Sequence, residues 1–414
     1  MKIVFASDFH LGFDFKGLRS KESFENALQV LEKSIQLNAD LVVLTGDLFD
    51  ESLPNQEVMV EAIKLFSKAK HDSLNKFDAK IKVFSDVEKF NVINFNSLPI
   101  LAIHGTHEYR GKNFKNALQV LEAAKLLCYQ HAGPALIEKN NEKICFYCFG
   151  GVPEKKAKDV LTYLQPKPLP NSKNVLLMHQ SFKEFLPFDD DEMVASLSLS
   201  DLPANFDLTV NGHLHWNKKL DLEKSIFLLP GSTIITQMKK LESECKKGFF
   251  VWDSIENSFS FVELDNQRRF FYHKLNVNHI TPADLLNEVR KTISECLAKN
   301  SSQLIPLIRI KVNGSLASGF NSTDFSFSEI EKEFSNKAVL SLSKNFESVS
   351  LKDRIEILRE KHKNFSSIKE LGMQLLEKNL NEAKFDSAFD FEQFFQLLEA
   401  SEPEKALELI LQKK

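Results

Sequence analysis

Five short polar segments of the sequence combine residues that can bind metal ions or transfer protons. They contain Asp8/His10, Asp47, Thr106/His107, His179 and His213/His215. Within the first and the last segment the two polar residues are two positions apart, so in extended backbone both side chains point to the same side. Carboxylates and imidazoles together suit divalent ions of the manganese, iron or zinc type. The set has more ligands than one ion needs, so it predicts a site for two ions.

Each of these segments follows an apolar stretch that predicts a short strand. The most informative stretch is residues 41–44, Leu-Val-Val-Leu, which is followed by Thr45-Gly46 and then by Asp47. A strand that is apolar on both faces is typical of a parallel sheet, and ligands bind at the carboxyl ends of such strands. Asp47 lies in the middle of the set and is the natural bridging ligand, because one carboxylate can give an oxygen to each ion.

Strands and helices alternate over the first part of the chain, which predicts an α/β catalytic domain over residues 1–255. We expect a crossover from the first strand to a parallel second strand. Residues 91–99 are polar and are predicted to be irregular. The expected strands are residues 2–8, 41–44, 80–84, 99–103, two or three within 131–149, 174–178, 208–210 and 227–229. The expected helices are residues 20–39, 54–70, 116–127 and 153–164.

A second domain is predicted over residues 262–346. Strands at 270–277, 307–312 and 339–342 alternate with helices at 281–298 and 327–334, and Thr281-Pro282 is a well-formed helix start. Residues 351–414 are charged and predicted to be helical, with many Phe and Leu residues. We favour docking to a partner groove or a coiled coil over packing on the core for this segment.

Composition indicates an ordinary soluble protein of 414 residues, with 43% hydrophobic and 27% charged residues. The net charge of −4 argues against a broad nucleic-acid-binding surface, so such binding must rest on local basic patches or on bound metal. No apolar run is long enough to span a bilayer. The first strand begins at Lys2, so we expect no signal peptide and a cytoplasmic location.

The five cysteines have no regular spacing, which suits a reducing interior. Cys145 and Cys148 form a C-x-x-C pair, but they lie in the apolar run ICFYCFG and no second pair exists. We therefore expect a buried strand there rather than a zinc site.

The order D-x-H, G-D, G-[N]-H-[DE], H and G-H-x-H resembles the signature of the calcineurin-like metallophosphoesterases through most of residues 1–255. The segments DFHLG, GDLFD, GGVPE, LLMHQSF, NGHLHW and LLPGS, in this order, narrow the resemblance. They are similar to the SbcD-type nucleases, the meiotic-recombination-eleven family of double-strand-break repair. The resemblance implies a sandwich of two mixed β-sheets flanked by helices, with a small α/β DNA-capping domain at 262–346. It also implies a helical segment at 351–414 that docks to an SMC-like ABC ATPase.

The same resemblance implies roles for the site residues. The first ion would be held by Asp8, His10, Asp47 and His215, and the second by Asp47, Thr106, His179 and His213. His107 would be the acid that protonates the leaving sugar oxygen. The implied enzyme is a homodimeric nuclease that requires two divalent metal ions, which we expect to be Mn²⁺. It would cleave DNA as a 3′→5′ double-strand exonuclease and as a single-strand endonuclease.

Two residues depart from the family pattern. Thr106 stands where the family has Asn, and a hydroxyl is a weaker and shorter ligand than an amide carbonyl. The second ion would then be held loosely, through water, or only with a phosphate present. Asp50 stands where some relatives carry a histidine that helps exonuclease action, which puts processivity on duplex ends in question.

Two other functions stay open from the sequence. One is a metallophosphoesterase for a small phosphodiester, a phosphoprotein or RNA, although such enzymes seldom need a second domain and a helical tail. The other is a non-catalytic scaffold of a repair complex, which Thr106 favours. Against the scaffold, every carboxylate and imidazole of the site is present, and a scaffold has no need of the general acid.

Overall fold

The computed structural model describes residues 1–86, 89–111, 114–186, 197–317 and 320–346. The predicted docking segment at 351–414 lies outside these residues. The chain divides into two compact units. Among the described residues, the first contains Met1–His273, Lys291–Arg309 and Glu329–Ser341, and the second contains Lys274–Arg290, Ile310–Ser328 and residues 342–346. The domain boundaries expected from the sequence stay predictions.

The first sheet carries the start of the chain and the Asp47 strand. Its order is β14-β13-β1-β2-β5-β6. The strands are β1 (Lys2–Ala6), β2 (Leu41–Thr45), β5 (Ile100–Ile103), β6 (Cys128–Tyr129), β13 (Gly248–Asp253) and β14 (Ser258–Glu263). Strands β1, β2, β5 and β6 are parallel, as the predicted crossover requires, and β13 and β14 add antiparallel pairs at the other edge.

The second sheet has the order β11-β12-β10-β9-β8-β7-β3-β4. The strands are β3 (Ala79–Asp86), β4 (Lys89–Phe95), β7 (Gly133–Lys139), β8 (Glu142–Cys148), β9 (Lys173–His179), β10 (Leu208–Gly212), β11 (Lys218–Asp221) and β12 (Ile226–Leu229). Strands β8, β9, β10 and β12 are parallel to one another. The C-x-x-C pair lies in β8 with both thiols free and buried, as expected of a strand.

Strand β4 shows that the expectation of an irregular segment from residue 91 was wrong. Residues 91–95 pair antiparallel with β3 at the edge of the sheet. Ile93 and Phe95 face the core, while Asn94 between them is exposed. Asparagine is depleted in strands, so the two asparagines of this segment concealed a period-two pattern.

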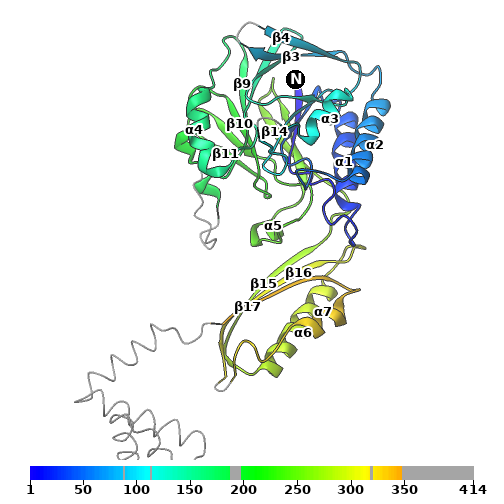
Figure 1. The fold of residues 1–414 in the computed structure, drawn as a ribbon, viewed down its shortest axis with the longest axis vertical. Helices are drawn as coiled ribbons and strands as arrows, with labels where there is room; N and C mark the ends of the chain where they lie inside the picture. The colour runs from blue at the N-terminus through cyan, green and yellow to red at the C-terminus, as the bar shows by residue number, and fades with distance from the viewer. Residues whose placement is uncertain (87–88, 112–113, 187–196, 318–319, 347–414) are drawn as a thin grey trace, which may run out of the picture. The chain divides into compact units, whose positions relative to one another are not determined.

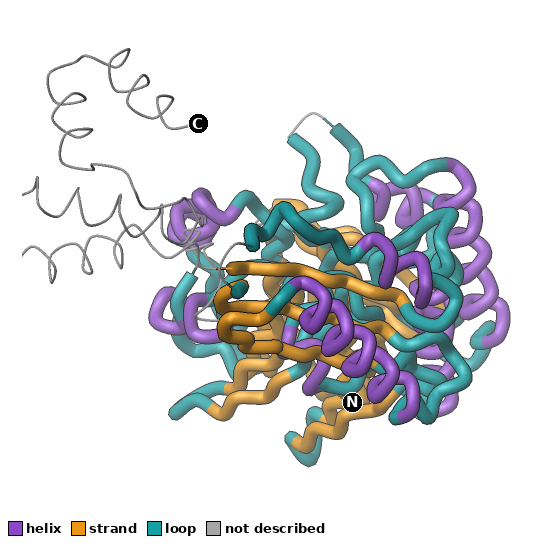
Figure 2. Tube along the Cα trace, turned by 90° about the horizontal axis from the view of Figure 1, so that it is seen from below, coloured by secondary structure: helices purple, strands orange, loops and turns teal. Residues whose placement is uncertain are grey.

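The two sheets pack face to face and helices cover both outer faces, which gives four layers (Figure 1). Helices α1 (Glu22–Gln36), α2 (Gln56–Asp72) and α3 (Ala117–Ala123) cover the first sheet, and α4 (Glu154–Leu164) covers the second. Strand β2 alternates between layers. Leu41 and Val43 pack between the sheets, and Val42 and Leu44 pack under the helices. The fold is therefore the predicted mixed α/β sandwich, and Figure 2 shows helices along the outside of its strands.

Helices α2 and α3 begin close to the predicted positions, and each has an asparagine cap. Asn55 caps α2 by accepting a hydrogen bond from the backbone N–H of Val58 at 2.9 Å. Asn116 caps α3 through a reciprocal pair of hydrogen bonds with Gln119. Such caps satisfy N–H groups that have no partner within the helix. A further short helix, α5 (Lys240–Glu244), precedes β13.

A third sheet has the order β15-β16-β17. Its strands are β15 (Phe270–Ile280), β16 (Leu307–Leu316) and β17 (Val339–Phe346), and the helices between them are α6 (Pro282–Ala298) and α7 (Ser328–Phe334). This is the predicted order of elements. Thr281 accepts a hydrogen bond from the backbone N–H of Asp284 at 3.2 Å, which confirms the predicted helix start. Among the described helices, none is long and apolar enough to cross a bilayer.

Candidate metal centre

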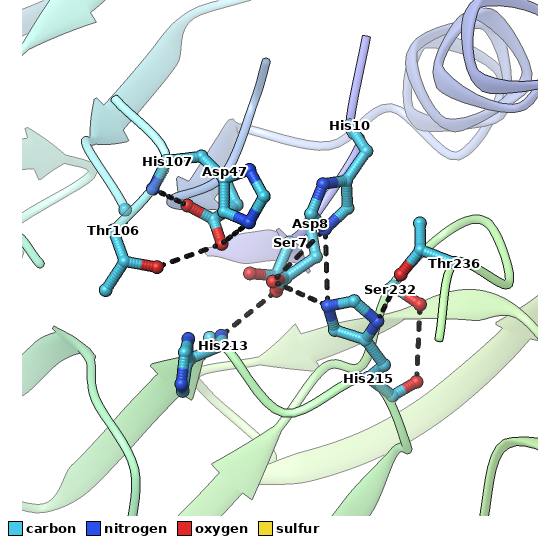
Figure 3. A network of polar contacts seen from close by, with 12 residues as sticks. Ser7, Asp8, His10, Asp47, Thr106, His107, His213, His215, Ser232 and Thr236 are labelled. Carbon is cyan, nitrogen blue, oxygen red and sulfur yellow. Dashed lines mark hydrogen bonds and ion pairs between the residues drawn. The ribbon is translucent and has the colours of Figure 1, made fainter. Parts of the chain in front are cut away.

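The five predicted polar segments meet in one place, where strands of the first and second sheets end (Figure 3). Asp8, His10 and His215 form one cluster, in which one ligand atom from each residue lies within 4.8 Å of the others. Asp47, His179 and His213 form a second cluster by the same measure. The structure therefore brings six of the seven predicted ligands together in two clusters. His10 also forms a third group of the same kind with Asp50 and His107.

Backbone hydrogen bonds join the two loops that carry the carboxylates. The N–H of Asp8 donates to the carbonyl of Gly46 at 3.0 Å, and the N–H of His10 donates to the carbonyl of Asp47 at 3.1 Å. Asp8, His10, Asp47 and His213 all have left-handed backbone, with φ of 52°, 48°, 46° and 74°. This conformation costs a residue other than glycine on the order of 1–3 kcal/mol, so the surrounding contacts must enforce it. Strained backbone of this kind is typical of functional sites.

Gly46 allows the second cluster to assemble. Its φ is +96°, and a Cβ atom at this position would lie 2.3 Å from Nδ1 of His179 and 2.8 Å from the Cα of Gly105. Both contacts are shorter than real Cβ atoms allow. The sequence Thr-Gly-Asp therefore places Asp47 beside His179 because the residue before the aspartate has no side chain.

In the first cluster, two imidazoles face one carboxylate. Nε2 of His10 and Nε2 of His215 are 3.2 Å apart, and they lie 3.9 and 3.6 Å from Oδ1 of Asp8. That oxygen is buried and has no hydrogen-bond partner among the described residues. A buried carboxylate oxygen without a partner is unfavourable, and a cation bound by these three atoms would satisfy it. The residues present therefore fit a metal ion.

The other ring nitrogens of these two histidines are held by neighbours. Nδ1 of His10 donates to Oδ1 of Asp50 at 3.0 Å, and Nδ1 of His215 shares a hydrogen bond of 2.9 Å with the Thr236 hydroxyl. Outer partners of this kind fix the ring orientation of metal-binding histidines. Burial lowers the pKa of His10, but the hydrogen bond to Asp50 and the charges of Asp47 and Asp8 raise it above its usual value overall.

A buried ion pair supports His215 from behind. The ammonium group of Lys247 donates to the carbonyl of His215 at 2.7 Å, to Oγ of Ser232 at 2.8 Å and to Oε1 of Glu242 at 3.0 Å. Burial alone would raise the pKa of Glu242, but Lys247 and His215 hold it well below its usual range. All three donors of the ammonium have acceptors, which is the condition under which a buried charge is tolerated.

In the second cluster, Asp47 faces His179. Nε2 of His179 lies 3.0 Å from Oδ2 of Asp47, while Nδ1 donates to the carbonyl of Thr45 at 2.7 Å. Burial opposes the charged imidazole, but Asp47 raises the pKa of His179 to about 10. Burial likewise opposes the charged carboxylate, but His179 holds the pKa of Asp47 far below its usual value. Asp47 thus draws positive charge to the point where the second ion would lie.

Thr106 and His107 complete the site on its open side. The Thr106 hydroxyl donates to Oδ2 of Asp47 at 3.5 Å, which is a long hydrogen bond. The backbone N–H of His107 donates to Oδ1 of Asp47 at 2.8 Å, and its Nδ1 donates to the backbone carbonyl of Asp50. Nε2 of His107 lies 4.0 Å from Oδ2 of Asp47, and the side chain is 41% exposed. This nitrogen is thus free to face a substrate.

Sequence reasoning assigned no role to Glu108, although the acidic residue after His107 belongs to the family pattern. The side chain is fully buried and accepts hydrogen bonds from the N–H of Phe49 at 2.6 Å and of Gly105 at 2.7 Å. It therefore ties the Asp47 loop to the His107 loop. Burial, together with the nearby Asp47 carboxylate, raises the pKa of Glu108 to about 7.

Thr236, Glu242 and Lys247 were also missed. They follow the last predicted ligand, His215, by more than 20 positions, and no spacing in the sequence marks them. Asp50 was noticed only as a departure, although its carboxylate contacts His10.

A mixed α/β sandwich with clusters of carboxylate and imidazole ligands at the ends of its strands is typical of a metallophosphoesterase. The profile of the calcineurin-like phosphoesterase family matches residues 1–217, and the chain belongs to this family.

Among characterised proteins, the chain is related to Mre11 proteins. It is 26% identical to the double-strand break repair protein MRE11 of Mus musculus over 306 residues, which cover 65% of this chain and 42% of that protein. It is 28% identical to the DNA double-strand break repair protein Mre11 of Saccharolobus solfataricus over 255 residues, covering 60% of this chain and 58% of that one. The chain therefore spans about half the length of these relatives.

Proposed function

We propose that the protein is a two-metal phosphodiesterase that cleaves DNA, with Mn²⁺ as the metal. The observation that supports this most is the pair of ligand clusters with the exposed His107 beside them. Asp8, His10 and His215 would hold one ion, and His179 and His213 the other. Asp47 would contribute to both ions, and Thr106 would lie near the second ion.

The residues around the ions have distinct tasks in this proposal. When bound, two ions would make water a better nucleophile at neutral pH and would offset the charge of the phosphate. Because Nδ1 of His107 donates to the carbonyl of Asp50, the proton that this ring can transfer is the one on Nε2. That nitrogen protonates the leaving sugar oxygen, which is the usual task of an imidazole near neutral pH. Glu108 holds the two loops that carry Asp47 and His107.

DNA as the substrate rests on the relatives, which are named as DNA double-strand break repair proteins. From the family resemblance of the sequence motifs we further propose the 3′→5′ double-strand exonuclease and single-strand endonuclease activities, action at broken ends, and assembly as a homodimer. Residues 262–346 would cap the DNA. Residues 351–414 would bind an SMC-like ABC ATPase.

Cleavage assays test the proposal directly. Purified protein is incubated with a single-stranded DNA oligonucleotide, a duplex with a blunt end, an RNA of the same sequence and a phosphate monoester, each with Mn²⁺ or Mg²⁺. We expect DNA cleavage with Mn²⁺ and little with Mg²⁺, because imidazole ligands suit softer ions than Mg²⁺. Equal rates with both metals would count against the assignment. Faster cleavage of the RNA or the monoester would instead favour another phosphoesterase.

The partner is tested separately. A chain that ends after Ser350 keeps every proposed site residue, so it should cleave short single strands as the full chain does. It should no longer co-purify with an SMC-like ATPase that the full chain retains. Equal retention of the ATPase by both chains would disprove the docking role of 351–414.

A further inference from the structure

Glu154 lies beside the second cluster, and neither the predicted ligand set nor the proposed reaction uses it. It is the first residue of α4, and Pro153 precedes it as the cap. Oε1 of Glu154 accepts a hydrogen bond from the backbone N–H of Ser181 at 3.2 Å and lies 3.5 Å from Nε2 of His213. Its other oxygen, Oε2, is buried and has no hydrogen-bond partner among the described residues.

Close backbone packing sets the position of Glu154. The N–H of Gly151 donates to the carbonyl of His104 at 2.8 Å, and Nε2 of His104 donates back to the carbonyl of Gly151 at 2.9 Å. A Cβ atom on Gly151 would lie 2.7 Å from the backbone nitrogen of Thr106, so only glycine fits. The segment GGVPE therefore runs against the loop that carries Thr106, and it brings a carboxylate to this side of the second cluster.

The second cluster needs support on this side. The Thr106 hydroxyl donates a hydrogen bond to Oδ2 of Asp47, and at 3.5 Å that contact is long. A hydroxyl in this position is a weaker metal ligand than the amide carbonyl of the asparagine in the family pattern. The ion is then bound mainly by the three remaining ligands, Asp47, His179 and His213. Of the two imidazoles, His179 is already fixed by the carbonyl of Thr45. His213 has Glu154 as its carboxylate neighbour.

We propose that Glu154 is a positioning residue for the second ion. Its carboxylate attracts the N–H at Nε2 of His213, which leaves Nδ1 of that ring with a lone pair for the metal. A carboxylate on the outer nitrogen of a metal-binding histidine fixes the tautomer and makes the ring a better ligand. Glu154 thereby compensates for Thr106 at the neighbouring position. This inference rests on the two-metal function proposed above.

Calorimetric titration of Mn²⁺ into the metal-free full chain tests the inference without any activity measurement. We expect two Mn²⁺ sites in the parent protein. In Glu154→Ala the affinity of the weaker site should fall by about 10–100-fold, the range seen when outer partners of metal ligands are removed. The tighter site should keep its affinity. Glu154→Gln retains an acceptor for Ser181 and should show a smaller loss.

Two further variants distinguish positioning from a general structural effect. Glu57→Gln is the control, because it removes an exposed carboxylate from the first turn of α2 and so makes the same charge change as Glu154→Gln at another helix start. It should leave the affinity of both Mn²⁺ sites unchanged. Thr106→Asn supplies the amide, so adding Glu154→Gln to that variant should cost less affinity than it does in the parent.

The outcomes separate the inference from the proposed function. A parent protein that binds fewer than two Mn²⁺ overturns both. A parent with two sites, whose weaker site is unchanged in folded Glu154→Ala and Glu154→Gln, overturns the inference alone. Equal weakening of both sites would also overturn it, because Glu154 would then act on the fold rather than on His213.

Discussion

Asp50 contacts both a candidate metal ligand and the candidate acid. Its carboxylate accepts a hydrogen bond from Nδ1 of His10 at 3.0 Å, and its backbone carbonyl accepts one from Nδ1 of His107. The side-chain contact resembles the carboxylate–histidine pairs found at metal sites. The backbone contact sets the tautomer of His107. Asp50 therefore supports the site through both its side chain and its backbone.

Asp50→Ala should weaken binding of the first ion. The backbone carbonyl remains, so the orientation of His107 is kept, while His10 loses its partner. Loss of such a partner typically costs about 10–100-fold in metal affinity, which Mn²⁺ titration would measure. Glu51→Ala removes the neighbouring exposed carboxylate and is the matched control. If both variants bind Mn²⁺ equally well, Asp50 does not support His10.

Lys247→Met should destabilise the protein strongly. Lys247 is 4% exposed, and its removal leaves the buried Glu242 carboxylate without its cation. Breaking one side of a buried pair typically costs about 3–5 kcal/mol, which the free energy of unfolding in urea would report. Lys246→Met is the control, because its ion pair with Glu263 is exposed and such pairs contribute little. A loss as small as that of the control would mean that the pair is not buried in solution.

Much of this site could be predicted from the sequence because its ligands follow strands. Each ligand lies at or just after the end of an apolar run, and parallel strands bring such ends to one side of the fold. From the spacing of Asp8 and His10 we predicted that extended backbone points both side chains to the same side. The structure brings the two side chains together in a different way. Both residues adopt left-handed backbone, and extended geometry does not hold there.

The residues that support the ligands could not be found in the same way. Glu242 in α5 and Lys247, the residue before β13, contact His215 although they lie 27 and 32 positions after it. No local sequence pattern predicts a contact between residues so far apart in the chain. Strand β4 was missed for a local reason, since its asparagines reduce the strand signal.

Thr106→Asn should tighten binding of the second ion. An amide carbonyl reaches further than a hydroxyl and is a better ligand, so it should replace the long contact between Thr106 and Asp47. The Mn²⁺ concentration that gives half-maximal cleavage should fall. Thr106→Ala is the complementary variant, and it should raise that concentration or leave it unchanged. A midpoint for Thr106→Asn at or above the parent value would mean that position 106 does not face the metal.

His107→Ala should separate binding from cleavage. His107 is exposed on the open side of the site and belongs to neither the Asp8 nor the Asp47 cluster, although it forms a third group with His10 and Asp50. Its Nδ1 is held by the backbone carbonyl of Asp50, so we assign His107 to proton transfer. Its removal should therefore leave the binding of two Mn²⁺ and of DNA unchanged. The rate of cleavage should fall by about 10²–10⁴-fold, the usual contribution of a general acid. Single-turnover cleavage of a labelled oligonucleotide at saturating Mn²⁺ measures this loss.

His213→Ala is the matched comparison, since it removes an imidazole that belongs to the second cluster. Metal stoichiometry should fall together with activity. The thermal stabilisation by Mn²⁺ should shrink as well, because an ion that binds only the folded state stabilises it by about 2.7 kcal/mol at 100 times its dissociation constant. Nearly full activity in His107→Ala would show that another group protonates the leaving oxygen. A parent protein that binds Mn²⁺ and DNA but cleaves nothing would establish the scaffold in place of the enzyme.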